Sequence, residues 1–289
     1  MKWEGERESE NVEDRRGSGG GGFGIGGRGI GIGTIVVALV AGWIFGINPL
    51  TVLGLLSGGG GAPTAQEAPA HAPPAGDQQA RFVSVVLAST EDAWTKVFRE
   101  EGATYRPPKL TLFRGAVGTA CGTGQSAMGP FYCPGDQKVY IDLDFFDTLK
   151  SRLGAPGEFA QAYVVAHEVG HHVQNLMGIT GKVDQLRARQ SERDANAMSV
   201  RVELQADCFA GVWSYQSQQA KQWLDQGDIE SALNAASRIG DDTLQRRSQG
   251  VVVPESFTHG SSQQRVSWFK RGLQSGRVED CNTFDTRSL

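Results

Sequence analysis

Residues 157–177 read GEFAQAYVVAHEVGHHVQNLM, and this stretch decides what kind of domain the chain forms. Apolar residues recur at helical spacing along it, and Gly178 offers a C-terminal stop. His167 and His171 stand four residues apart, so both imidazoles emerge on one face of the helix. Glu168 is offset by one position, which lets its carboxylate address a water molecule beside a metal ion. The stretch therefore predicts a buried helix that carries two zinc ligands.

The H-E-x-x-H pattern fixes only three residues, so two exposed histidines on an ordinary helix are the alternative. Burial is favoured because the apolar residues 163–166 precede the motif, and buried His and Glu side chains need partners. A zinc site that is open to substrate also needs a third protein ligand. Glu203 and Asp207 lie four apart on a second predicted helix, where one carboxylate would bind zinc and the other would orient a histidine N–H. A solvated acidic face is the alternative for this pair.

The rest of the chain beyond residue 80 predicts an α+β domain dominated by helices, with a small sheet. Helical periodicity or composition marks four further stretches, at residues 91–101, 183–220, 226–239 and 262–273. Residues 109–113 and 139–145 are typical of strands, the second because apolar and polar residues alternate along it.

The first eighty residues differ from the rest in composition. Residues 1–29 mix charges with many glycines and predict a disordered head. Residues 30–56 are almost wholly apolar and long enough to form a transmembrane helix, whereas residues 57–80, rich in Gly, Ala and Pro, predict a tether to a domain at 81–289. Basic residues precede the apolar stretch, which predicts a single-pass chain with a cytoplasmic N-terminus and an extracytoplasmic domain. A cleaved signal peptide is the alternative.

Several partner classes can be weighed from the same sequence. The net charge of −4 gives no concentrated basic surface, so nucleic acid is excluded as a partner. Gly42 and Gly46 form a G-x-x-x-G pattern inside the apolar stretch, which makes a weak homodimer through that segment a candidate.

The four cysteines all follow the apolar stretch and can oxidise if that part lies outside the cytoplasm. None belongs to a C-x-x-C pair of the kind that binds zinc. Sequence proximity favours Cys121 with Cys133 and leaves Cys208 with Cys281, although four cysteines allow three pairings.

Several segments together resemble a known family. They are AHEVGHHVQNLMGI, CGTGQSAMGPFYCPGDQKVYIDLDFF, PESFTHGSSQQRVSWFKRG, residues 203–207 before Cys208, and NVEDRRG in the head. They look like the bacterial neutral zinc metallopeptidase family of single-span membrane proteins, over most of the chain apart from the tether. The resemblance implies a zincin-like domain of the gluzincin type, one zinc ion per chain and a location at the bacterial cell membrane.

The resemblance also implies roles for single residues. It assigns zinc to His167, His171 and Glu203, the general base to Glu168, and a supporting role to Asp207. Thr258-His259 with Arg265 is similar to a Thr-His...Arg segment of integral-membrane gluzincins, in which His259 would donate a hydrogen bond to the developing oxyanion. Gly260 stands where those relatives have proline. Residues 139–145 would be the exposed edge strand that pairs with an extended substrate, as in zincins.

The resulting hypothesis is an endopeptidase that hydrolyses protein or peptide substrates with Glu168 as general base. The alternative is a membrane-anchored scaffold or binding protein that zinc stabilises without catalysis. Glu168 argues against the alternative, because a structural metal site has no use for a base. A third interpretation is a zinc hydrolase that cuts a non-peptide amide.

Overall fold

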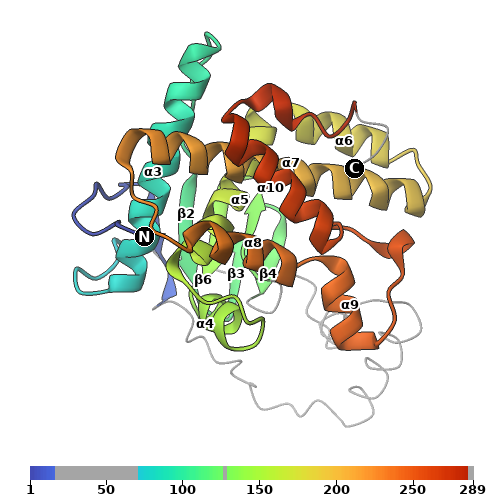
Figure 1. Cartoon of the computed structure of the whole chain (residues 1–289), viewed down its shortest axis with the longest axis horizontal. Helices are drawn as coiled ribbons and strands as arrows, with labels where there is room; N and C mark the ends of the chain where they lie inside the picture. Colours follow the sequence, from blue (N-terminus) through green and yellow to red (C-terminus); the bar gives the residue numbers. More distant parts are fainter. Residues whose placement is uncertain (17–70, 126–128, 286–289) are drawn as a thin grey trace, which may run out of the picture. The chain divides into compact units, whose positions relative to one another are not determined.

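The central element of the fold is helix α5 (Glu158–Leu176), which carries the H-E-x-x-H motif within one residue of the predicted bounds. In the computed structural model, which describes residues 1–16, 71–125 and 129–285, α5 contacts the sheet through β5 and β6 and the helix layer through α7 and α8 (Figure 1). The chain enters α5 at Gly157 and leaves it at Gly178, both with positive φ (116° and 71°), which glycine adopts without strain.

The described residues form a helix-dominated α+β structure with small sheets. Its other helices are α3 (Gln78–Glu100), α4 (Asp144–Ser151), α6 (Ile179–Arg187), α7 (Glu192–Lys221), α8 (Asp228–Arg238), α9 (Asp241–Gln249) and α10 (Ser262–Ser275), with 3-10 turns at Pro254–Ser256 and Val278–Cys281. The four-stranded sheet has the order β1 (Val12–Asp14), β2 (Lys109–Phe113), β6 (Lys138–Asp142) and β5 (Phe131–Cys133). A separate hairpin pairs β3 (Ala116–Thr119) with β4 (Gly122–Gln125).

The sheet corrects one expectation about the substrate strand. β6 pairs with β2 in parallel and with β5 in antiparallel orientation, so it is an interior strand. The prediction that residues 139–145 offer an exposed edge to substrate is therefore wrong. β5, which ends the sheet beside α5, is the edge strand at that side.

The helices follow the predicted pattern with local differences. The expected helix at 183–220 is two helices, because Ser191 caps the start of α7 with its hydroxyl, which accepts a hydrogen bond from the Asp194 N–H. α3 begins at Gln78, well before the predicted residue 91, since Asp77 caps its first turn. α9 was not expected from the sequence. α10 begins with a capping box of Ser261 and Gln264.

Helices α7 and α10 cross in close contact because both carry glycine at the crossing. A methyl group added at Gly272 would overlap the carbonyl oxygen of Cys208, and one added at Gly211 would overlap that of Phe269. The missing side chains let the backbones touch. Cys208 also forms a disulfide with Cys281, and Cys121 forms one with Cys133, so the expected pairing is confirmed.

The N-terminal residues differ from the expectation of a disordered head. Met1–Arg16 belong to the same compact unit as the residues after 70, and β1 extends the sheet as its first strand. Their charged side chains pair with groups of the domain, as with Glu13 and the ammonium groups of Lys109 and Lys138.

The predicted transmembrane helix at 30–56, the dimer contact at Gly42 and Gly46, and the tether up to residue 70 lie outside the described residues. Within the part of the chain that is described, no helix is both long enough and apolar enough to cross a bilayer.

Candidate metal centre

The site forms where α5 passes α7 at close range. A methyl group added at Gly170, inside the motif, would lie 3.0 Å from the carbonyl oxygen of Ala206, so glycine at this position allows the helices to approach. Ala206 lies between Glu203 and Asp207, so the same contact brings both carboxylates of α7 to the histidines of α5.

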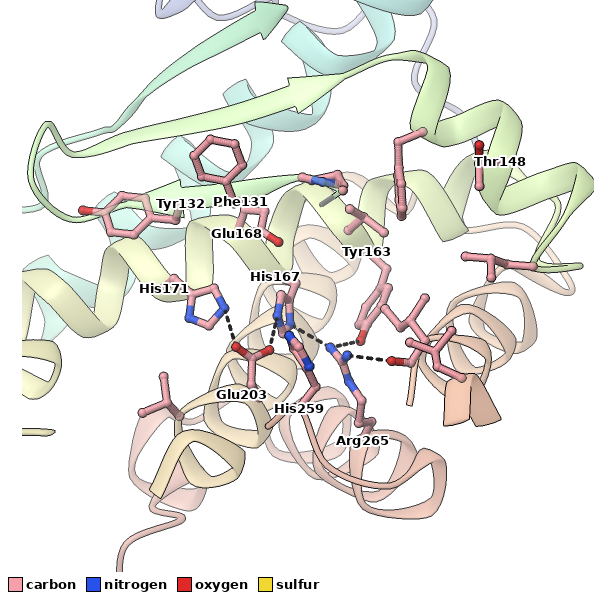
Figure 2. A pocket seen from close by; sticks show the side chains of 18 of the residues that line it. Phe131, Tyr132, Thr148, Tyr163, His167, Glu168, His171, Glu203, His259 and Arg265 are labelled. Atoms are coloured by element: carbon pink, nitrogen blue, oxygen red, sulfur yellow. Dashed lines mark hydrogen bonds and ion pairs between the residues drawn. The ribbon is translucent and has the colours of Figure 1, made fainter. Parts of the chain in front are cut away.

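His167, His171 and Glu203 point toward one another (Figure 2). His167 Nε2 lies 3.1 Å from Glu203 Oε2, and His171 Nε2 lies 3.5 Å from Glu203 Oε1. One ligand atom from each residue lies within 4.8 Å of the others. Two imidazoles and a carboxylate at this spacing are the donor set of a zinc site that keeps a position open.

The outer nitrogens of both imidazoles already have partners. His167 Nδ1 lies 2.9 Å from Asp207 Oδ1, and His171 Nδ1 lies 2.9 Å from Gln174 Oε1. Both partners are acceptors, so each Nδ1 carries the proton and each Nε2 directs its lone pair toward Glu203. Three electron-pair donors then face one another, which is favourable only if a positive charge, either a bound proton or a metal cation, lies between them. The residues fit a zinc ion on this ground.

The electrostatics of the site agree with that reading. Burial alone would lower the pKa of His167, but the carboxylates of Asp207 and Glu203 outweigh it and raise the pKa to about 10. Burial would raise the pKa of Glu203, but the adjacent His171 and His167 hold it well below its usual range. The pocket therefore stabilises positive charge among the three donors, which a divalent cation supplies.

Asp207 is fully buried, and α10 supplies its counter-charge. Arg265 Nε lies 2.9 Å from Asp207 Oδ2 and Nη2 lies 3.0 Å from Oδ1, a bidentate pair. The Tyr163 hydroxyl, from α5, donates to Asp207 Oδ1 at 2.5 Å. The carboxylate that orients His167 is thus held from two other sides, which fixes the imidazole.

His259 lies at the cleft on the loop before α10, and Asp241 holds it. The Asp241 carboxylate accepts the backbone N–H groups of Thr258, His259 and Gly260 at 2.7, 2.6 and 3.0 Å, and it lies 3.2 Å from His259 Nδ1. This hydrogen bond raises the pKa of His259 against the opposing effect of burial. Sequence reasoning missed Asp241, because only the tertiary fold places its carboxylate against the His259 loop.

The backbone conformation at Gly260 explains why this chain has glycine where similar segments have proline. Its φ is 91°, which proline cannot adopt because its ring fixes φ near −65°. The loop that carries His259 therefore has its own geometry in this chain, and Asp241 defines it.

Glu168 lines the same cleft as the metal ligands and is 7% exposed. The cleft has a volume of about 970 Å³ and receives Phe131 and Tyr132 from β5. Tyr132 also ties β5 to α5, since its hydroxyl lies 3.0 Å from His172 Nδ1 and accepts a hydrogen bond from Asn175 Nδ2 at 3.0 Å. His172 donates from Nε2 to the Arg106 carbonyl oxygen at 2.7 Å and so takes no part in the ligand triangle.

The sequence of this chain is similar to those of known proteins over nearly its whole length. The family model described as "Putative neutral zinc metallopeptidase" matches residues 1–284. The uncharacterized protein YpfJ of Escherichia coli K12 is 54% identical over 291 residues, which cover 98% of this chain and 99% of that protein. The uncharacterized protein Rv2575 of Mycobacterium tuberculosis is 44% identical over 219 residues, covering 72% of this chain and 73% of the relative. No solved structure matches. The chain therefore belongs to the family of neutral zinc metallopeptidases that this model describes.

Proposed function

We propose that the chain is a zinc-dependent endopeptidase of the gluzincin type, which hydrolyses peptide bonds in protein or peptide substrates. The observation that carries the proposal is the triangle of His167, His171 and Glu203, with both outer imidazole nitrogens already bonded and Glu168 in the same cleft. Zinc, when bound there, polarises a carbonyl group and acidifies water.

Glu168 is the general base in this proposal. It takes a proton from the attacking water and returns it to the nitrogen of the departing amine. The residue is 7% exposed and lines the cleft, so its carboxylate is in reach of a substrate that enters there. Asp207 and Arg265 keep His167 in the tautomer that presents Nε2 to the metal.

His259 stabilises the negative charge that develops on the carbonyl oxygen of the substrate. Its raised pKa keeps the imidazole protonated to a higher pH than an ordinary histidine, so it can donate to an oxyanion near neutrality. Asp241 fixes the loop and is a positioning residue for His259.

An extended substrate would pair with the outer edge of β5. Phe131–Cys133 ends the sheet, and two of its residues line the cleft, so a peptide that adds to this edge passes the metal ligands. The cleft also receives Phe145, Leu153, Val164 and Leu244, which favours an apolar side chain near the scissile bond.

Two disulfides support an extracytoplasmic domain, because such bonds persist in oxidising compartments. The apolar residues 30–56 would attach the chain to the bacterial membrane.

The test uses the purified full chain, its zinc content and its cleavage of an unfolded protein such as reduced casein. We expect about one zinc ion per chain, cleavage lost with zinc retained in Glu168→Gln, and both lost in Glu203→Ala. Glu158→Gln, on the exposed first turn of the same helix, is the matched control and should behave as the parent.

The same experiment separates the alternatives. Bound zinc with no cleavage, and no difference between the parent and Glu168→Gln, would replace the peptidase with a zinc-stabilised scaffold. Cleavage of other amides without cleavage of peptides would move the proposal to a different hydrolase.

A further inference from the structure

The N-terminal residues are built into the sheet by backbone pairing. β1 runs parallel to β2, with Val12 opposite Leu110 and Asp14 opposite Leu112. The pairing continues at both ends, since the Leu110 N–H donates to the Asn11 carbonyl oxygen and the Arg15 N–H donates to that of Leu112, each at 2.8 Å. Removing this strand would expose the edge of β2.

The aromatic side chain of Trp3 packs the first residues of the chain against α3. Trp3 is 7% exposed and lies edge-on to Phe82 of α3, with 5.3 Å between the ring centroids. The neighbouring Lys2 N–H donates to the Trp223 carbonyl oxygen at 2.7 Å. Burial of so large an apolar side chain favours docking of the N-terminal residues.

A buried carboxylate of α3 takes its hydrogen bonds from the N-terminal residues. Glu91 is 7% exposed and accepts from Ser9 Oγ at 2.5 Å, from Asn11 Nδ2 at 2.8 Å and from Arg7 Nη2 at 3.0 Å. Ser84, on the same helix, accepts from the Ser9 N–H at 3.0 Å. Undocking would leave α3 with a carboxylate that has lost these donors.

The basic residues that predicted a cytoplasmic N-terminus also have partners in the domain. Arg7 pairs with Glu91 and with Asp92, and Arg16 pairs with Asp77, the cap of α3, at 2.6 Å. Their presence before the apolar stretch is therefore explained by docking onto α3, and retention in the cytoplasm is not needed to account for it.

Two described residues on either side of residues 17–70 hydrogen-bond to each other. Asp14 and His71 pair in antiparallel orientation, with 2.7 Å from the Asp14 nitrogen to the His71 oxygen and 3.2 Å in the reverse bond. The apolar core of a bilayer is about 30 Å thick. A single crossing between these residues would put them on opposite faces, where they could not hydrogen-bond.

We propose that Met1–Arg16 and the catalytic domain fold together on the same side of the membrane, as one unit. The segment between Arg16 and His71 then begins and ends on the same face, whatever contact its apolar residues 30–56 make with lipid. The proposal replaces the single-pass orientation expected from the basic residues. It also excludes removal of the apolar stretch as a signal peptide, because residues 1–16 would be lost with it. It does not depend on catalysis.

The test places single cysteines in the full chain, expressed in bacterial cells that are converted to spheroplasts. Glu4→Cys reports on the N-terminal residues and Glu230→Cys on α8, and both positions are exposed. A membrane-impermeant maleimide is applied before and after lysis. We expect the two cysteines to react from the same side. Reaction from opposite sides would overturn the proposal, as would a mature chain that lacks residues 1–16.

A second measurement tests docking itself. Ser9→Cys with Ser84→Cys should form a disulfide in the oxidised full chain, detected by non-reducing peptide mapping, because the two residues are direct neighbours: the Ser9 N–H donates to Ser84 Oγ, and Ser84 Oγ donates to the Ser9 carbonyl oxygen, each at 3.0 Å. Glu10→Cys with Ser84→Cys is the matched control, since Glu10 is adjacent in sequence but exposed. A yield at least tenfold higher for the Ser9 pair is expected. Equal yields for the two pairs would overturn the proposal.

Discussion

Different kinds of interaction surround the two edge strands of the four-stranded sheet. Beside β5 lie the metal ligands and a charge network that is almost fully buried, with Asp207 at 0% and Arg265 at 3% exposure. Beside β1, Met1–Arg16 are held by ion pairs with long exposed members, such as Arg7 at 47% and Lys109 at 57%. The first edge therefore depends on a few buried charged groups, whereas the second combines partly exposed ion pairs with the buried side chain of Trp3.

This difference sets the expected cost of single substitutions. Removing one partner of a buried charge pair leaves the other charge uncompensated and costs about 3–5 kcal/mol. Exposed pairs contribute about 0.2–1 kcal/mol each. Single substitutions among the buried charges beside β5 (the metal edge) should therefore lower the free energy of unfolding strongly. Single changes of charge in Met1–Arg16 (the N-terminal edge) should have little effect, whereas loss of the buried Trp3 side chain should undock that segment.

The largest effect is expected for Asp207→Ala. It leaves Arg265 buried without its partner, so the free energy of unfolding in urea should fall by about 3–5 kcal/mol. His167 also loses its orienting carboxylate, so zinc affinity in a chelator competition should fall about 10–100-fold. Asp92→Ala, at an exposed ion pair of Arg7, is the control and should cost less than about 1 kcal/mol. Equal costs for the two variants would break the comparison.

Trp3→Ala should have the next largest effect. Loss of a buried tryptophan costs about 3 kcal/mol, so the N-terminal strand should undock. Hydrogen exchange at Val12–Asp14 would report this as loss of protection. Zinc content should be unchanged, because no residue of the ligand triangle contacts this edge. Unchanged protection of β1 would contradict the role of Trp3 as an anchor.

His259→Ala tests the metal edge without touching a ligand. Loss of one oxyanion donor should lower kcat about 10²-fold with zinc content retained. The measurement is steady-state cleavage of a fluorogenic peptide together with metal analysis. A change in KM alone, with kcat preserved, would assign His259 to substrate binding.

Asp241→Asn should change the pH dependence of cleavage. The hydrogen bond from Asp241 raises the pKa of His259, so the imidazolium persists below that raised pKa and is lost as the pH rises through it. Without the carboxylate the pKa falls, and the alkaline limb of kcat should move to lower pH. A limb at the parent position would show that His259 does not set it.

The smallest effect is expected for Arg7→Gln. The guanidinium is about half exposed, and the buried carboxylate of Glu91 keeps its hydrogen bonds from Ser9 and Asn11, so the loss of stability should stay below about 1 kcal/mol. The Ser9→Cys and Ser84→Cys disulfide should still form in this background. Failure to form it would show that one exposed charge controls docking.

Local patterns made the metal site predictable. The spacing of His167 and His171 follows from the geometry of one helix, and α5 ends within one residue of its predicted bounds. Glu203 and Asp207 were placed together by the same four-residue spacing, and the structure brings Glu203 to both histidines. Such signals need no knowledge of the fold, because each pair lies on one face of its own helix, His167 and His171 on α5 and Glu203 and Asp207 on α7.

Contacts between distant segments could not be predicted in the same way. β1 pairs with a strand about a hundred residues later, and its neighbouring charges resemble a solvated head until Glu91 and Lys138 are brought beside them. Asp241 shows the same limit at the metal edge, since only the tertiary fold places it against His259. In both cases the role of the segment becomes visible only when the tertiary fold brings its partner beside it.

The disulfide between Cys208 and Cys281 has a consequence for chain entropy. It closes a covalent ring next to Asp207, and the ring contains Asp241, His259 and Arg265. Closing a loop of this length lowers the conformational entropy of the unfolded chain, which raises the free energy of the unfolded state by about 4 kcal/mol. Because Cys208 belongs to α7, the bond keeps Asp241, His259 and Arg265 on a loop attached to α7 even in the unfolded chain. Reduction of this disulfide should therefore slow refolding of the site more than it alters the folded site.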